Sequence, residues 1–193
     1  MFLEYDPFPT MQSCRCHMAI SQITPTLYLS GVDAALSHTV ITNRHITLIV
    51  NATVEHICPE YTGVECMRVP VLDQPHASLS EHFDTVAERI HNNQTGSTLV
   101  HCSAGRSRSA SLVMAYLMKF RQATLLQAHY WVLEVRPFIR PNAGFWRQLL
   151  EYERKLHGKN SVRMVATVLG VLPEAIDVNE GSAYCLNGWL NLD

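Results

Sequence analysis

The sequence predicts an α/β fold in which helices flank a central, mostly parallel and twisted β-sheet. Two observations carry this prediction: strand-like runs alternate with helix-like segments, and a helical stretch fills much of the second half of the chain. The 193 residues are enough for one domain with tails. We expect a flexible arm over residues 1–20, the domain over residues 21–160 and an irregular tail over residues 161–193.

Four segments have the composition of β-strands, and they cover residues 26–30, 46–53, 64–71 and 98–101. The second is β-branched and almost wholly apolar, which is typical of a buried strand in a mostly parallel sheet. The third alternates between apolar and polar residues, as strands commonly do. The fourth leads directly into a loop of small residues.

Two capping boxes predict where helices begin, because the side chains at the first and last positions of the box can bond each other's backbone amides. The box at residues 78–81 predicts a helix that runs to about His91. The box at residues 124–127 predicts a helix that ends near Arg136, since Pro137 follows.

Two further helices are expected in the same half of the chain. One covers residues 107–120 and follows the loop of small residues. The other begins after Asn142, whose side chain suits an N-cap, and it carries apolar residues at helical spacing. Gly158 is expected to end it.

The charge distribution favours a local anionic ligand. The net charge is −2, yet residues 101–163 carry 11 basic and 3 acidic side chains. A basic segment between acidic ones suits a small anion better than nucleic acid, so we expect no nucleic-acid partner. No apolar run reaches the roughly 18 residues that a membrane span needs. The N-terminal stretch lacks the features of a secretory signal, and we expect a location in the cytoplasm, the nucleus or both.

Six cysteines lie at positions 14, 16, 58, 66, 102 and 185. Their spacing shows no dense disulfide framework, so we expect free thiols in a reducing compartment. Cys14 and Cys16, next to His17, lack a second ligand pair at zinc spacing, which disfavours a metal site there. We expect neither a metal nor a cofactor.

The sharpest feature is the loop from Cys102 to Arg108, in which five residues separate the thiol from the guanidinium. A strand enters this loop and a helix leaves it, so successive backbone amides and the helix dipole converge on one point. Ala104 and Gly105 let the backbone close around a small anion. These features predict a phosphate cradle, in which the donors favour the thiolate of Cys102 and Arg108 binds two phosphoryl oxygens.

Thiolate attack on a phosphate ester requires an acid that protonates the leaving group. Asp73 suits this role, because it follows the predicted strand over residues 64–71 and is held by Pro75. A turn-forming aspartate is the alternative from position alone. The acid would then be another carboxylate, such as Asp84.

The stretch His-Cys-Ser-Ala-Gly-Arg-Ser-Arg-Ser over residues 101–109 resembles the signature loop of the cysteine-dependent protein tyrosine phosphatases, in the form of the dual-specificity subgroup. The resemblance covers about residues 21–165 and includes residues 21–29, 49–53, 69–73, 115–118 and 140–149. Residues 158–165 resemble the small atypical enzymes of the fourteen, eighteen and twenty-one branch.

The resemblance implies a role for each residue of the loop. Cys102 would be the nucleophile that becomes phosphocysteine, Arg108 the phosphate-binding arginine and Asp73 the general acid. Ser109 would stabilise the thiolate as it leaves, and His101 would support the loop. The remaining loop residues would bind the substrate phosphate: Ser103, Ala104, Gly105, Arg106 and Ser107.

The implied activity is hydrolysis of phosphotyrosine, phosphoserine and phosphothreonine in proteins through a phosphocysteine intermediate. Phosphorylated proteins, with kinases as one candidate class, would be the partners, and the oligomeric state is left open. The chain has no insertion like the phosphotyrosine-recognition loop of the larger tyrosine-specific enzymes, which favours a shallow pocket.

Two alternatives to this activity are kept. Arg106 stands where this branch usually has an apolar residue, so phosphoinositides or other non-protein phosphate esters form one alternative. A phosphoprotein-binding module with little turnover is the other, although the thiol, the arginine and the acid are all present. The Asp73 segment and the Ser-Arg-Ser ending of the loop disfavour a sulfurtransferase.

Overall fold

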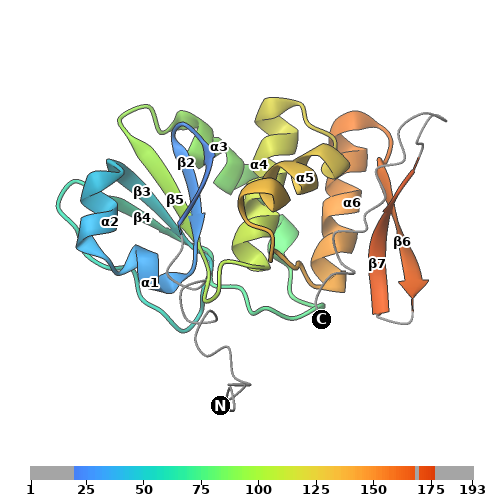
Figure 1. Ribbon diagram of the computed structural model, residues 1–193, viewed down its shortest axis with the longest axis horizontal. Coiled ribbons are helices and arrows are strands. Elements are labelled where there is room, and N and C mark those ends of the chain that lie inside the picture. The colour runs from blue at the N-terminus through green and yellow to red at the C-terminus, as the bar shows by residue number, and fades with distance from the viewer. Residues whose placement is uncertain (1–19, 168–169, 177–193) are drawn as a thin grey trace, which may run out of the picture.

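The computed structural model describes residues 20–167 and 170–176, and it contains a five-stranded sheet flanked by helices (Figure 1). β5 (Ser97–His101) lies between β2 (Leu27–Ser30) and β3 (Ile46–Asn51) and is parallel to both. β4 (Glu65–Arg68) continues the parallel sheet beyond β3. β1 (Ser21–Thr24) pairs antiparallel with β2 at the opposite edge. The predicted mostly parallel sheet is thereby confirmed.

Helices cover the sheet in two unequal layers (Figure 1). The short helices α1 (Val32–Ala35) and α2 (His38–Asn43) contribute to a small apolar cluster on one face. The larger core lies on the other face. The elements on that side are η1 (Leu79–His82, a 3₁₀ helix), α3 (Phe83–Asn92), α4 (Arg108–Arg121), α5 (Leu125–Val135) and α6 (Ala143–His157). α4 is buried over its first eleven residues, so the site that it begins is set deep in the domain.

Local signals correctly predict several helix ends. Thr124 forms the expected capping box at the start of α5. The side chain of Asn142 accepts a hydrogen bond from the amide of Phe145 (3.0 Å) at the start of α6. Gly158 ends α6 with a φ of 75°, a left-handed conformation that glycine adopts at little cost.

The capping box expected at residues 78–81 is wrong. The side chain of Ser78 makes no capping hydrogen bond, and η1 precedes α3. Gln148 of α6 replaces it as the capping group: its side chain accepts from the amide of Ser80 (2.7 Å) and donates to the carbonyl of Ala77 (2.8 Å). A partner distant in sequence therefore binds backbone groups of this turn, although they are not the amides of Ser78 and Glu81 that the local box was expected to bind.

The expectation of an irregular tail is wrong for residues 162–167 and 170–175. β6 (Val162–Thr167) and β7 (Gly170–Ala175) form an antiparallel hairpin beside α6 (Figure 1), and Val162 packs against the main core. β1, α1 and α2 are also absent from the sequence prediction, because elements this short show no reliable periodicity. The arm over residues 1–19 and the rest of the tail lie outside the described residues, so the expected domain boundaries stay a prediction.

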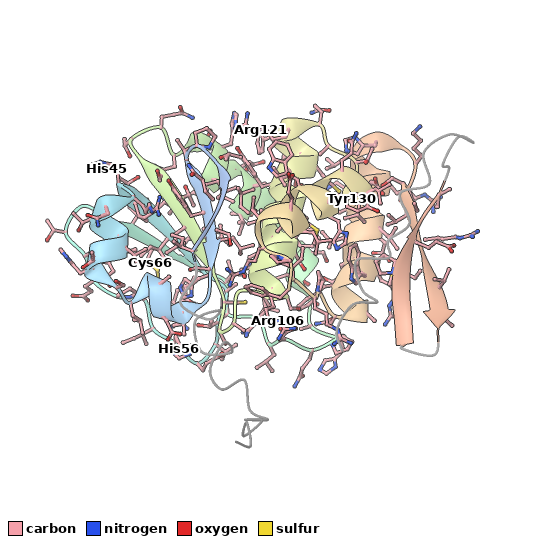
Figure 2. All side chains as sticks on the ribbon, viewed as in Figure 1. His45, His56, Cys66, Arg106, Arg121 and Tyr130 are labelled. Atoms are coloured by element: carbon pink, nitrogen blue, oxygen red, sulfur yellow. A yellow bond between two sulfur atoms is a disulfide. The ribbon has the colours of Figure 1, made fainter. Side chains whose placement is uncertain are left out.

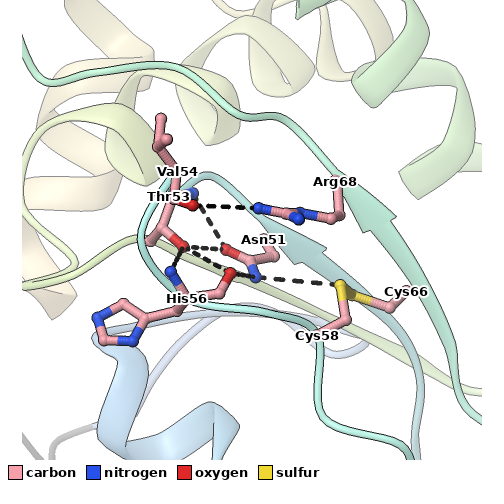
Figure 3. Close-up of a disulfide and its surroundings, with 7 residues drawn as sticks. All are labelled: Asn51, Thr53, Val54, His56, Cys58, Cys66 and Arg68. Atoms are coloured by element: carbon pink, nitrogen blue, oxygen red, sulfur yellow. Dashed lines mark hydrogen bonds between the residues drawn. A yellow bond between two sulfur atoms is a disulfide. The ribbon is translucent and has the colours of Figure 1, made fainter.

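The expected thiol state is wrong for two cysteines. Cys58 and Cys66 form a disulfide between the segment after β3 and the strand β4, with Cα atoms 6.1 Å apart (Figure 3). Parallel pairing of β3 with β4 brings these two segments together. Cys102 is a free, buried thiol. The cysteines at positions 14, 16 and 185 lie outside the described residues, and so does the metal site considered there.

Within residues 20–167 and 170–176, no helix is both long and apolar enough to cross a membrane.

Candidate active site

The predicted loop lies at the carboxyl end of β5, a central strand of the parallel sheet. This edge is where open α/β sheets usually bind their ligands. Cys102 comes directly after β5 and is 2% exposed. Its Sγ lies 3.1 Å from Oγ of Ser109 in the first turn of α4, so the structure brings these two predicted site residues into contact.

The backbone of residues 103–107 has its carbonyl groups bound to the surrounding fold. All five carbonyl oxygens accept hydrogen bonds, from the amides of Val32, Ser111 and Arg140 and from the side chain of Arg136. By contrast, none of the five amides of this stretch donates a hydrogen bond to another described residue. Five free donors before the positive end of the α4 dipole make an anion-binding nest.

Two residues hold the turn in this shape. Gly105 has a φ of 66°, and an added Cβ would collide with the backbone of Ser30. Arg136, which is 0% exposed, donates from Nε to the carbonyl of Gly105 (2.6 Å) and from Nη2 to that of Ala104 (3.2 Å). The sequence predicted Arg136 only as the end of a helix. Its contact with Gly105 could not be predicted, because 31 residues separate the two along the chain.

Arg108 is anchored at both terminal nitrogens and free at Nε. Nη1 donates to the carbonyl of Val71 (3.2 Å), and Nη2 donates to Oγ of Ser103 (2.9 Å). Nε is buried without a hydrogen-bond partner among the described residues. Its neighbour there is Oδ2 of Asp73, 3.9 Å away, and Nε and Nη2 are the two nitrogens with which a guanidinium can bind two oxygens of one phosphate, a geometry that only arginine offers.

Asp73 lies beside the loop and is oriented by it. Its Oδ1 accepts hydrogen bonds from Oγ of Ser107 (2.7 Å) and Nδ2 of Asn142 (2.8 Å). Its Oδ2 is 3.9 Å from Nε of Arg108 and accepts no hydrogen bond from a described residue. Because Oδ1 is already bound, Oδ2 is the oxygen that can carry a proton. Sequence reasoning named Asn142 only as a helix cap and missed this second contact.

A close approach between α6 and the Asp73 segment makes this arrangement possible. Gly144 lies in the first turn of α6, and an added Cβ would collide with the carbonyl of Pro75. The helix N-terminus consequently packs on backbone only two residues beyond Asp73. Gly144 carries no signal of this role in the sequence, since glycine within a helix more often weakens it.

Glu55 is a residue at the loop that sequence reasoning missed. It belongs to the segment after β3, and its carboxylate accepts a hydrogen bond from Oγ of Ser103. Its Oε1 lies 3.7 Å from Nη2 of Arg108. The hydrogen bond from Ser103 outweighs burial and, with help from backbone amides and Arg108, lowers the pKa of Glu55 to about 2. Glu55 is therefore ionised at neutral pH.

Of the remaining predicted site residues, His101 is buried and Arg106 is exposed. His101 is buried in β5, and its Nδ1 lies 3.4 Å from the carbonyl oxygen of Cys102. Burial lowers the pKa of His101 to about 4, so its ring is neutral at neutral pH. Arg106 is exposed on the loop (Figure 2), and its Nε donates to the carbonyl of Phe138 (3.0 Å).

Asp84, the alternative acid, belongs to a different cluster. Its carboxylate accepts hydrogen bonds from Lys119 (2.7 Å), Tyr152 (2.8 Å) and Lys155 (3.0 Å), where α3 faces α4 and α6. The hydrogen bond from Lys119 leads the interactions that hold the pKa of Asp84 far below its usual range. Asp84 therefore has no proton to donate at neutral pH, and the structure favours Asp73.

The fold and the loop together define a class of enzyme. Residues 27–155, well over half of the chain, match the catalytic domain of the dual specificity phosphatases. The chain therefore belongs to the dual specificity phosphatase family, and it is an enzyme of that class.

Individual relatives cover most of the chain. Dual specificity protein phosphatase 14 of Bos taurus is 49% identical over 172 residues, which span 88% of this chain and 86% of the relative. Dual specificity protein phosphatase 18 of Homo sapiens is 45% identical over 157 residues, spanning 80% and 84%. The crystal structure of human DUSP28 matches with a TM-score of 0.69 at 35% identity, over 71% of this chain and 94% of that one. The predicted resemblance to the small atypical enzymes is thereby confirmed.

Proposed function

We propose that the chain hydrolyses phosphotyrosine, phosphoserine and phosphothreonine in proteins through a phosphocysteine intermediate on Cys102. One observation above all supports this mechanism. The five amides of residues 103–107 have no partner in the described fold, and the buried Nε of Arg108 has none either. Consecutive amides without a hydrogen-bond partner next to a helix N-terminus favour an anion, and the oxygens of a phosphate can accept several such bonds at once.

In the first step, the thiolate of Cys102 attacks phosphorus through Sγ, so an S–P bond forms and the P–O bond to the substrate breaks. The departing oxygen takes the proton that Oδ2 of Asp73 carries. Arg108 and the amides bind the charge that develops on the phosphoryl oxygens. The hydrogen bonds from Ser107 and Asn142 hold Oδ1, which leaves Oδ2 for the transfer.

In the second step, water attacks the phosphocysteine and the S–P bond breaks. Asp73, now a carboxylate, takes a proton from that water, so the acid is regenerated and inorganic phosphate is released. The hydroxyl of Ser109, 3.1 Å from Sγ, donates a hydrogen bond to the departing thiolate of Cys102. No step requires a metal or a cofactor, and their absence stays a prediction.

Protein substrates are favoured over the two alternatives. The relatives that match most of the chain are named protein phosphatases, which favours protein substrates over phosphoinositides. A binding module without turnover would need neither the thiol nor the acid, and here Cys102 and Asp73 both lie at the loop. Phosphorylated proteins, with kinases as one class, are therefore the proposed partners. A location in the cytoplasm, the nucleus or both also stays a prediction.

The test compares wild type with Cys102→Ser on phosphopeptides and phosphoinositides. Wild type should hydrolyse phosphotyrosine and phosphoserine peptides, resist a metal chelator and be inhibited by vanadate. Cys102→Ser should bind phosphopeptide with no turnover, because a serine hydroxyl stays protonated and attacks poorly. Thermal unfolding of both proteins shows whether the variant is folded. Turnover that a chelator abolishes, or turnover of phosphoinositides alone, would contradict the proposal.

A further inference from the structure

The rim of the phosphate-binding loop carries opposite charges from two different parts of the fold. Glu55 comes from the segment after β3, and its side chain is 47% exposed. Arg106 is exposed on the loop itself and is tied to Phe138, between α5 and α6. The neighbours of a phosphorylated residue must cross this rim when the phosphate enters the loop.

The hydrogen bonds of Glu55 do not neutralise its negative charge. Oε1 accepts from Ser103 and Oε2 accepts from the amide of Val54 (3.1 Å), and neither donor carries a charge. Its cationic partner is Arg108, whose Nη2 lies 3.7 Å from Oε1 of Glu55. A bound phosphate offsets the charge of Arg108, so the exposed side of Glu55 faces an approaching peptide as an anion.

The segment around Glu55 is anchored on both sides (Figure 3). Oδ1 of Asn51 accepts hydrogen bonds from the amide (3.0 Å) and the hydroxyl (2.6 Å) of Thr53. Nδ2 of Asn51 donates to the carbonyl of His56 (2.9 Å). Three residues beyond Glu55, Cys58 is tied to β4 by its disulfide. The carboxylate is therefore held at the rim by a fixed segment.

We propose that Glu55 is a specificity-determining residue that favours phosphosites with a cationic side chain beside the phosphorylated residue. The inference rests on the proposed role of residues 102–108 as the site of the substrate phosphate. A lysine at that neighbouring position forms an ion pair with Glu55, whereas a glutamate or a second phosphate there meets a like charge. Half-exposed charges interact modestly, so the preference for lysine over glutamate should be about three- to tenfold.

The test uses phosphotyrosine peptides that are identical except for lysine, alanine or glutamate directly before or directly after the phosphotyrosine. For wild type, kcat/KM should be about three- to tenfold higher with lysine than with glutamate on at least one side. Glu55→Gln keeps the shape and the acceptor for Ser103 but removes the charge, so this ratio should fall below about twofold. Glu60→Gln removes a charge from an exposed position of the same segment and should keep the wild-type ratio.

Other outcomes would overturn the inference. A wild-type ratio near one on both sides would do so, as would a ratio that Glu55→Gln leaves unchanged. An equal loss of kcat on every peptide in Glu55→Gln would instead make Glu55 a positioning residue for Arg108. Failure of the proposed function is distinguishable, because wild type would then turn over none of the peptides, including those with alanine.

Discussion

Replacing Asp73 by asparagine separates a proton donor from a residue that merely shapes a turn. The amide oxygen of asparagine can still accept the hydrogen bonds that Ser107 and Asn142 donate to Oδ1. The change therefore removes the transferable proton at Oδ2 and leaves the anchoring intact. We expect the free energy of unfolding to change by less than about 1 kcal/mol.

The effect on the rate should depend on the leaving group. Removing a general acid costs about 10²–10⁴-fold, or about 3–5 kcal/mol of barrier, when the leaving oxygen needs a proton. Phosphoserine and phosphotyrosine peptides should lose activity to this extent in Asp73→Asn. An aryl phosphate whose leaving group has a low pKa should lose much less, because its anion departs without protonation.

The assay is kcat/KM of wild type and Asp73→Asn on a series of aryl phosphates with graded leaving-group pKa. The dependence on leaving-group pKa should be steeper in the variant. Asp73→Ala is the control for anchoring: it also leaves Ser107 and Asn142 without their partner, so it should lower stability by about 1–3 kcal/mol. Equal rate losses across the series in Asp73→Asn, or no loss, would refute the role of Asp73 as the acid.

Four further predictions follow from single contacts. Arg108→Lys should reduce kcat/KM nearly as much as loss of the thiol, because lysine lacks the bidentate edge; a variant that keeps most of the wild-type value would contradict this role. Arg136→Met should lower the free energy of unfolding in urea by about 2–5 kcal/mol and weaken vanadate binding, because two loop carbonyls lose their donor; normal vanadate affinity would argue against a positioning role. Burial lowers the pKa of His129 to about 4, so the unfolded chain binds a proton between pH 6.5 and 4 that the folded chain does not. His129 should therefore contribute up to about 3 kcal/mol to the fall in wild-type stability as the pH drops through this range, beside a similar contribution from His101, and His129→Leu should lack its share in urea titrations at each pH. Replacing both Cys58 and Cys66 by serine should lower stability by about 2–3 kcal/mol because the unfolded chain loses a cross-link, and equal urea midpoints for the two proteins would rule this out.

The sequence alone was sufficient for features whose partners are close along the chain. The loop from Cys102 to Arg108 is such a feature, because seven consecutive residues supply the thiol, the amides and the guanidinium. The capping of α5 and α6 is another, since Thr124 and Asn142 bind amides only three residues away. The apolar run of β3 likewise identified a strand of the parallel sheet, because a strand that is buried on both faces consists almost entirely of apolar residues.

Only the tertiary structure could decide the contacts that complete the site. Glu55 meets Ser103 across 48 residues, and Asn142 meets Asp73 across 69. At the start of η1 the amide of Ser80 likewise donates to the side chain of Gln148 from 68 residues away, and Ser78 makes no capping hydrogen bond. Side-chain type and spacing do not encode such pairs. They arise because α6 packs against the loops and β3 lies beside β5. This packing removes from water polar groups that are distant in sequence, and a buried polar group is costly unless it is hydrogen-bonded.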